Sequence, residues 1–186
     1  MPTPIHILGF SGSLRRGSCN SALLRVAAGV LPEKVTLEIY DLASIPLYNG
    51  DLESEGLPVA VLEFRARIKA ADALLVATPE YNYSIPGVLK NAIDWASRPP
   101  EQPFDGKPLA MMGTAGGLGG ARAQYHLRQV LVCLNAHALN KPEVQIPRAW
   151  EKFDQNGTPT DPEIAKSVAS LVQALAGWTR TLRGEG

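Results

Sequence analysis

The stretch IHILGFSGSLRRGSCN, from Ile5 to Asn20, decides the fold. Its first part, Ile5 to Ser11, is a short apolar run of the length of a buried strand, and a polar loop follows it. From Ser21 to Leu31 apolar residues recur at helical spacing, and Pro32 ends that segment. A buried strand, a polar loop and a helix in this order predict an α/β protein.

The same alternation of strands and helices continues along the chain. Further strands are predicted over Thr36–Asp41, Ala73–Thr78, Leu109–Thr114 and Ala138–Ile146, the last of them broken by Pro142. Further helices are predicted over Val59–Ala71, Val88–Ala96, Ala121–Leu134 and Asp161–Arg183. Between Asp41 and Pro58 we expect an irregular surface loop, and at Asn156-Gly157 a tight turn without a chemical role.

This pattern predicts right-handed βαβ crossovers and a doubly wound, five-stranded parallel sheet. Residues 71–78, ADALLVAT, are apolar on both faces and are the expected centre of that sheet. We expect one domain over residues 1–186. Ligands of such sheets bind beyond the carboxyl ends of the strands, so the loops after the first, third and fourth strands are the candidate site.

Composition excludes several classes of function. The chain has 18 basic and 18 acidic residues, so no overall field favours nucleic acid or an anionic membrane. No stretch approaches the roughly 18 apolar residues of a membrane span, and we expect a soluble, cytoplasmic protein. Two distant cysteines and three scattered histidines give no support to a disulfide framework or a metal site.

The loop after the first strand has the composition of a phosphate site. It lies before a helix N-terminus, where unpaired N–H groups and the helix dipole favour an anion. Ser13, Ser18 and Asn20 add neutral donors, and Arg15 adds a charged one. The loop matches neither G-x-x-x-x-G-K-[ST] nor G-x-G-x-x-G, which leaves a monophosphate. Cys19 is included among the cofactor-binding candidates, where it is expected to be a small passive residue rather than a redox thiol. The alternative for this loop is that its residues only cap the helix.

The loops after the third and fourth strands suit a flat heteroaromatic ring. The first of them carries the candidate residues Pro79, Glu80, Tyr81, Asn82, Tyr83 and Ser84. Its aromatic rings can pack beside the ligand, and its backbone N–H groups can donate to the pyrimidine end of a flavin. The second loop has four glycines within Thr114–Gly120 and adds the candidates Thr114, Gly116 and Gly117, where backbone can approach a ligand closely. Simple surface packing of Tyr83 and a flexible connection after Thr114 are the alternatives.

Three motifs together resemble one protein family. GSLRRGSCN (12–20), TPEYNYSIPGVLKNAIDWASRP (78–99) and GGARAQYHLRQVL (119–131) are similar to the NAD(P)H-dependent FMN reductases of the flavodoxin-like fold, and most of all to their bacterial quinone and chromate reductase branch. The similarity extends from Ile5 to about Pro142. It differs most at Thr114–Gly117, where the branch has more serine.

The resemblance implies an enzyme in which FMN carries the chemistry and no protein residue is catalytic. It implies that the FMN phosphate is held by Ser13, Arg15, Ser18 and Asn20, with the ring between Pro79–Ser84 and Thr114–Gly117. NADPH or NADH would supply hydride, and quinones, chromate, azo compounds or free flavin would accept electrons. It also implies a homodimer or homotetramer packed through the helix after Gly87, whose apolar residues Val88, Leu89, Ala92, Ile93 and Trp95 face either a partner or their own sheet.

Other functions remain open at this point. A flavodoxin-type electron carrier would bind FMN without accepting hydride, although the acidic docking surface expected of one is missing from this neutral chain. A non-enzymatic flavin-binding module has the same fold. Within enzymes, a reductase that releases reduced flavin is the alternative. No residue of the sequence decides between NADH and NADPH; Arg16 and Arg122 are the candidates for contacting the nucleotide's 2′-phosphate.

Overall fold

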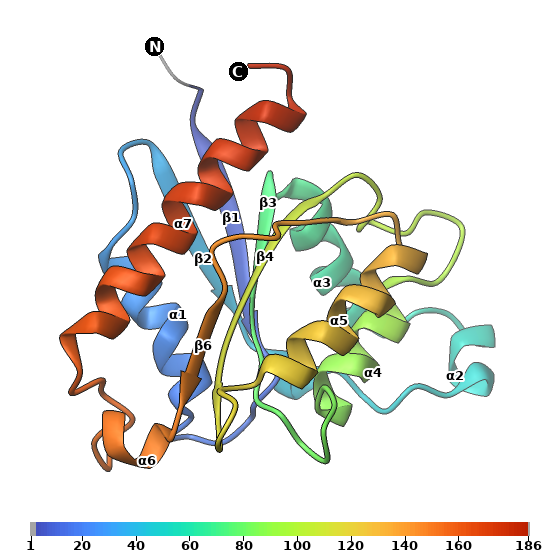
Figure 1. Ribbon diagram of the computed structural model, residues 1–186. Helices are drawn as coiled ribbons and strands as arrows, with labels where there is room; N and C mark the ends of the chain where they lie inside the picture. Colours follow the sequence, from blue (N-terminus) through green and yellow to red (C-terminus); the bar gives the residue numbers. More distant parts are fainter. Residues whose placement is uncertain (1–2, 186) are drawn as a thin grey trace.

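The computed structural model describes residues 3–185 and shows one twisted parallel sheet with helices on both faces (Figure 1). The strands in these residues are β1 (Ile5–Ser11), β2 (Val35–Tyr40), β3 (Ala73–Ala77), β4 (Pro108–Ala115), β5 (His137–Ala138) and β6 (Val144–Pro147). Their order in the sheet is β2-β1-β3-β4-β5, and β6 also pairs with β4. This is the doubly wound, flavodoxin-like order, which confirms the predicted fold class as a single α/β domain.

Two layers of helices cover the sheet. The helices are α1 (Cys19–Gly29), the 3-10 turn η1 (Leu42–Ser44), α2 (Gly50–Ser54), α3 (Val59–Ala70), α4 (Gly87–Ala96), α5 (Ala121–Cys133), α6 (Ala149–Lys152) and α7 (Pro162–Leu182). Helices α1 and α7 pack on one face, and α3, α4 and α5 pack on the other (Figure 1). Each predicted helix is found with its ends within two residues of the expected ones. No helix of residues 3–185 is long and apolar enough to cross a membrane.

Strand β3 is the middle strand, as predicted for the segment that is apolar on both faces. All five of its residues are buried, because helices cover it on each side. Its neighbours β1 and β4 run parallel to it, with Phe10 opposite Val76 and Val76 opposite Met111. Their carboxyl ends therefore meet at one edge of the sheet.

The fifth position of the sheet differs from the single strand predicted there. It consists of two pieces: β5 pairs with Pro108 and Leu109 at the start of β4, and β6 pairs with Met112–Ala115 at its end. Pro142 lies between the pieces and has no N–H group to donate to β4, so the break that the sequence predicted is confirmed.

Three short helices lie where the sequence predicted none. The expected loop after Asp41 contains η1 and α2, so that prediction was partly wrong. Both begin at a capping side chain: Asp41 Oδ1 accepts the Ala43 N–H at 2.9 Å, and Asn49 Oδ1 accepts the Asp51 N–H at 2.9 Å. Helix α6 was also missed, because four residues are too few for an apolar period.

Helix α4 answers one question that the sequence left open. Leu89, Ala92, Ile93 and Trp95 are at most 2% exposed within this one chain, and only Val88 is half-buried. Their apolar surface is therefore used by the chain's own sheet. It supplies no argument for a partner subunit.

Candidate functional site

The loops after β1, β3 and β4 meet at the carboxyl edge of the sheet. Backbone hydrogen bonds tie them together: the Gly12 N–H donates to the Ala77 carbonyl at 2.9 Å, and the Thr78 N–H donates to the Met112 carbonyl at 3.0 Å. A cavity of about 260 Å³ lies between the loops and is lined by Ser13, Arg15, Ser18, Cys19, Asn20, Pro79, Glu80, Tyr81, Thr114, Ala115, Gly116 and Ala149. Ten of the fourteen predicted site residues therefore share one cavity.

Three of the other predicted residues line an adjoining cavity. It has a volume of about 290 Å³, and its walls are formed by Glu80, Asn82, Tyr83, Ala115, Gly116, Gly117, Leu118, Gly120 and Arg122. Glu80 and Gly116 line both cavities, so the two are neighbours. Ser84 lines neither; its hydroxyl lies 3.1 Å from His126 Nδ1.

The loop after β1, the predicted phosphate site, leads directly into helix α1. Ser18 is the N-cap residue, and its hydroxyl oxygen accepts the Ser21 N–H at 3.2 Å, so the capping interpretation is confirmed for this residue. The N–H groups of Cys19 and Asn20 open the first turn, which holds no acidic side chain. The positive end of the α1 dipole thus faces a cavity that Arg15 also lines.

Asn20 joins the first loop to the fourth strand. Its Nδ2 donates to the Thr114 carbonyl and its Oδ1 accepts the Thr114 N–H, both at 3.0 Å. Both residues are buried, and the Thr114 hydroxyl donates to the Ile146 carbonyl of β6 at 2.8 Å. Asn20 and the Thr114 hydroxyl therefore shape the cavity through bonds within the protein.

The loop after β3 turns back on itself at the edge of the site. Tyr81 and Ser84 exchange two backbone hydrogen bonds of 3.0 Å, and the residues between them, Asn82 and Tyr83, have positive φ angles of 49° and 68°. Such a turn suits glycine better than these side chains, so its backbone is strained. The bridge leaves the N–H groups of Asn82 and Tyr83 outside it, at the exposed tip.

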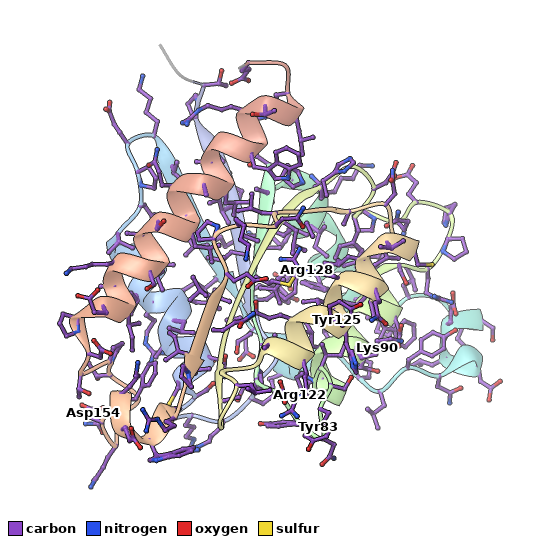
Figure 2. The ribbon with its side chains drawn as sticks, in the orientation of Figure 1. Tyr83, Lys90, Arg122, Tyr125, Arg128 and Asp154 are labelled. Carbon is purple, nitrogen blue, oxygen red and sulfur yellow. The ribbon has the colours of Figure 1, made fainter. Side chains whose placement is uncertain are left out.

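Glu80 connects this loop to the first turn of α5, the helix that follows β4. Its Oε1 lies 2.6 Å from Arg122 Nε, and its Oε2 accepts the backbone N–H groups of Arg122 and Ala123 at 3.0 and 3.3 Å. The carboxylate thus binds the N-terminus of α5. The Arg122 guanidinium in turn lies 3.6 Å from the centre of the Tyr83 ring, and Figure 2 shows both at the lower end of α5.

The glycines of the site fall into two groups. A side-chain carbon at Gly113 would lie 2.5 Å from the Thr78 carbonyl oxygen, and one at Gly119 would lie 2.6 Å from backbone atoms of β6. These glycines are required by packing. At Gly116 and Gly117 the same carbon would meet nothing within 4 Å, so open space adjoins the backbone where the sequence predicted a close approach of ligand.

Sequence reasoning missed two features of the site. Arg122, named there only as a candidate for contacting the 2′-phosphate, pairs instead with Glu80, and their opposite charges were the available signal. Ala149 of α6 also lines the first cavity, and the preceding Arg148 N–H donates to the Gly116 carbonyl at 3.0 Å. Behind the loop after β1 lies the turn at Asn156-Gly157, where a side-chain carbon at Gly157 would be 3.3 Å from the Gly17 carbonyl oxygen.

The surroundings of Cys19 argue against a reactive thiol at this site. Burial raises the pKa of the Cys19 thiol above its usual value, and the nearby Arg15 only partly opposes this shift. The thiol is therefore protonated at neutral pH, as expected of a passive residue. Residues 3–185 hold no group of three or more histidine, cysteine or carboxylate side chains that could bind a metal ion.

Known proteins are similar to this chain over most of its length. Residues 5–151 match the family model of NADPH-dependent FMN reductases. An NAD(P)H-dependent FMN reductase of Pseudomonas aeruginosa is 57% identical over 99% of this chain and 100% of its own length. A quinone reductase of Escherichia coli is 46% identical over 77% of this chain and 78% of its own.

A solved structure is also similar over nearly the whole chain. It is the flavoenzyme NAD(P)H:(acceptor) oxidoreductase FerB of Paracoccus denitrificans, which has a TM-score of 0.85 and 35% identity and covers 95% of this chain and 98% of its own. With a family model that matches most of the chain and relatives of this identity, the chain belongs to the NADPH-dependent FMN reductase family.

Proposed function

We propose that this protein is an NAD(P)H-dependent FMN reductase that passes electrons to quinone-like acceptors. The observation that carries the proposal is the meeting of three loops from β1, β3 and β4 around one cavity, with a helix N-terminus at one end and open glycine backbone at the other. Relatives named FMN reductase and quinone reductase, 42–57% identical to this chain, support the same activity.

The residues present fit FMN. Its phosphate would lie at the N-terminus of α1, held by the first-turn N–H groups, Ser13 and the Arg15 guanidinium. Its ring would lie between the Pro79–Ser84 loop and the open backbone at Gly116 and Gly117. Bound FMN would accept hydride from the nicotinamide and pass electrons to the acceptor.

The protein's own residues would position the flavin ring and leave it accessible to its substrates. Glu80 is held by three hydrogen bonds to α5, so it fixes the position of the Tyr81–Ser84 turn relative to α5 rather than transferring a proton. The tip N–H groups of that turn can donate to the pyrimidine edge of the ring, where negative charge increases on reduction. Tyr81 and Tyr83 are 55% and 65% exposed, which leaves the site open to a donor and then an acceptor in turn.

We further propose that the protein acts in the cytoplasm as a homodimer or homotetramer. The large apolar side chains Leu47, Val59 and Val132 are each 79% exposed or more, and any of them that lies at the subunit contact would be buried by it. Chromate and azo compounds are proposed as further acceptors, since an open flavin site is not selective. Light scattering after gel filtration measures the assembly, and a monomer at micromolar concentration would exclude it.

One experiment tests the main proposal. The purified protein is examined by visible absorption and then mixed anaerobically with NADPH, NADH and finally a quinone. Bleaching of a bound flavin band by a nucleotide, reversed by the quinone, is the expected result. A bound flavin that neither nucleotide bleaches would favour the electron carrier or the binding module, and flavin lost on gel filtration would favour the reductase that releases it.

A further inference from the structure

A cavity of about 320 Å³ lies on the other side of the loop after β1, beside the candidate FMN cavity. It lies between that loop, the carboxyl end of β2 and η1, and is lined by Ser11, Ser13, Leu14, Arg15, Arg16, Ser21, Leu24, Ile39, Tyr40, Asp41 and Leu42. Ser13 and Arg15 also line the candidate FMN cavity. The two cavities therefore meet across these two residues.

Two arginines give this cavity a positive wall. Arg15 and Arg16 are both exposed, and within residues 3–185 neither lies within 4 Å of a carboxylate oxygen, whereas Arg67, Arg122 and Arg148 each pair with a glutamate. Arg16 lines this cavity and not the candidate FMN cavity. Its guanidinium is thus a free donor to an anion that is not the FMN phosphate.

The remaining wall is suited to a flat, partly apolar group. Leu14 and Ile39 are 50% and 45% exposed, and Leu24 and Leu42 are buried beneath them. A heteroaromatic ring placed here would remove the first two from water. The neighbouring Asp41 carboxylate, which caps η1 through the Ala43 N–H, can accept a hydrogen bond from an amino group or a sugar hydroxyl.

We propose that this cavity binds the adenosine end of the dinucleotide, with the 2′-phosphate of NADPH on Arg16. The adenine ring lies against Leu14 and Ile39, and the dinucleotide extends over the shared rim of the two cavities toward a nicotinamide in the flavin cavity, leaving Ser13 and Arg15 to the FMN phosphate. The proposal rests on the proposed function for the presence of a nicotinamide donor. It goes beyond it because it makes Arg16 the residue that selects NADPH over NADH.

Fragments that lack the nicotinamide test the site without turnover. Adenosine 2′,5′-bisphosphate and 5′-AMP are titrated separately into the FMN-loaded protein by calorimetry. A charge-assisted hydrogen bond to the extra phosphate predicts about tenfold or tighter binding of the bisphosphate. Equal affinity for the two fragments would overturn the proposal.

Arg16→Ala identifies the residue, and Arg25→Ala is the matched control. Both arginines are exposed, but Arg25 lies on α1 and lines neither cavity. In Arg16→Ala we expect the bisphosphate to bind no better than 5′-AMP, with kcat/KM for NADPH lowered about tenfold or more, chiefly through KM. The kcat/KM for NADH and the FMN affinity stay unchanged, and Arg25→Ala behaves as the wild type.

Asp41→Asn should strengthen bisphosphate binding, which is the opposite of the effect expected for Arg16→Ala. The asparagine side-chain oxygen can still cap η1, so the fold is retained while a negative charge leaves the cavity. The bisphosphate is expected to bind about two- to fivefold more tightly at low salt, and 5′-AMP to change less. Unchanged or weaker bisphosphate binding would contradict the placement of the phosphate.

Failure of this proposal is distinct from failure of the proposed function. If Arg16→Ala lowers the kcat/KM for NADPH and NADH equally, or retains the tighter bisphosphate binding, Arg16 does not contact the 2′-phosphate although the enzyme is still an FMN reductase. If the wild type binds FMN but is bleached by neither nucleotide, the proposed function fails first. Preferential bisphosphate binding that depends on Arg16 would then still support a nucleotide site.

Discussion

Glu80 and Arg122 are 42 residues apart in the chain, yet Glu80 Oε1 lies 2.6 Å from Arg122 Nε and Glu80 Oε2 accepts the Arg122 N–H at 3.0 Å. The Glu80 side chain is only 7% exposed. One carboxylate thereby binds both the Arg122 side chain and the backbone at the N-terminus of α5. It fixes the spacing between the two loops that would enclose the flavin ring.

Glu80→Gln should weaken this connection without stopping the chemistry. The amide retains one acceptor but loses the charge, and we expect the free energy of unfolding to fall by about 1–3 kcal/mol. FMN binding should weaken several-fold, because the Tyr81–Ser84 turn loses its support. Urea unfolding and fluorescence titration with FMN measure the two effects.

The rate of hydride transfer at saturating FMN separates positioning from catalysis. In Glu80→Gln it should remain within about tenfold of wild type in anaerobic stopped-flow experiments. A fall below about one hundredth, with FMN still bound, would make Glu80 a catalytic group.

Two glycine substitutions should separate cofactor binding from folding. In Gly116→Val the new side chain meets open space, so the melting temperature should change little while FMN affinity falls by tenfold or more. In Gly113→Ala the added carbon meets the Thr78 carbonyl at 2.5 Å, so we expect a loss of stability of about 1–3 kcal/mol. Thermal unfolding of both apo variants and FMN titration check the contrast; tight FMN binding by Gly116→Val would remove this glycine from the site.

Asn20→Ala should lower the stability of the protein even when no cofactor is bound. It leaves the buried N–H and carbonyl of Thr114 without the two 3.0 Å bonds that Asn20 makes, a loss of about 2–4 kcal/mol. Asn140→Ala, which removes an exposed contact with Arg128, is the control and should cost less than about 0.5 kcal/mol. Equal unfolding midpoints for the two variants would contradict this role of Asn20.

Cys19 should react slowly with alkylating reagents until the pH is high. Because burial raises its pKa, the reactive thiolate forms only at a pH above that of an ordinary cysteine. The rate of iodoacetamide labelling against pH, measured in a Cys133→Ser background, gives the midpoint. Cys19→Ala should retain wild-type hydride transfer; rapid labelling of Cys19 at pH 6 or a large loss of activity would support a redox role.

The sequence predicts the parts of this protein that depend on local pattern. Strand β3 and its neighbours are apolar runs, and helix α1 follows from spacing and from Ser18, so their positions were predictable within two residues. Pairings between distant loops were not, because they depend on how the sheet edge brings side chains together. The Asn20–Thr114 and Glu80–Arg122 contacts are of this kind, and so are the roles of α6 and of the cavity beside Arg16.

The contact between Gly17 and Gly157 would give the carboxyl-terminal third of the chain a share in holding the proposed cofactor. The turn at Asn156-Gly157 lies behind the loop after β1. A side-chain carbon at Gly157 would lie only 3.3 Å from the Gly17 carbonyl oxygen, and the φ of 77° at Gly157 disfavours other residues. A protease that cuts beside the exposed residues Gln155 and Asn156 of this turn would therefore loosen the loop after β1 without touching it. Bound FMN would in turn protect the turn from cleavage, so digestion at this one site reports how much of the protein carries its cofactor.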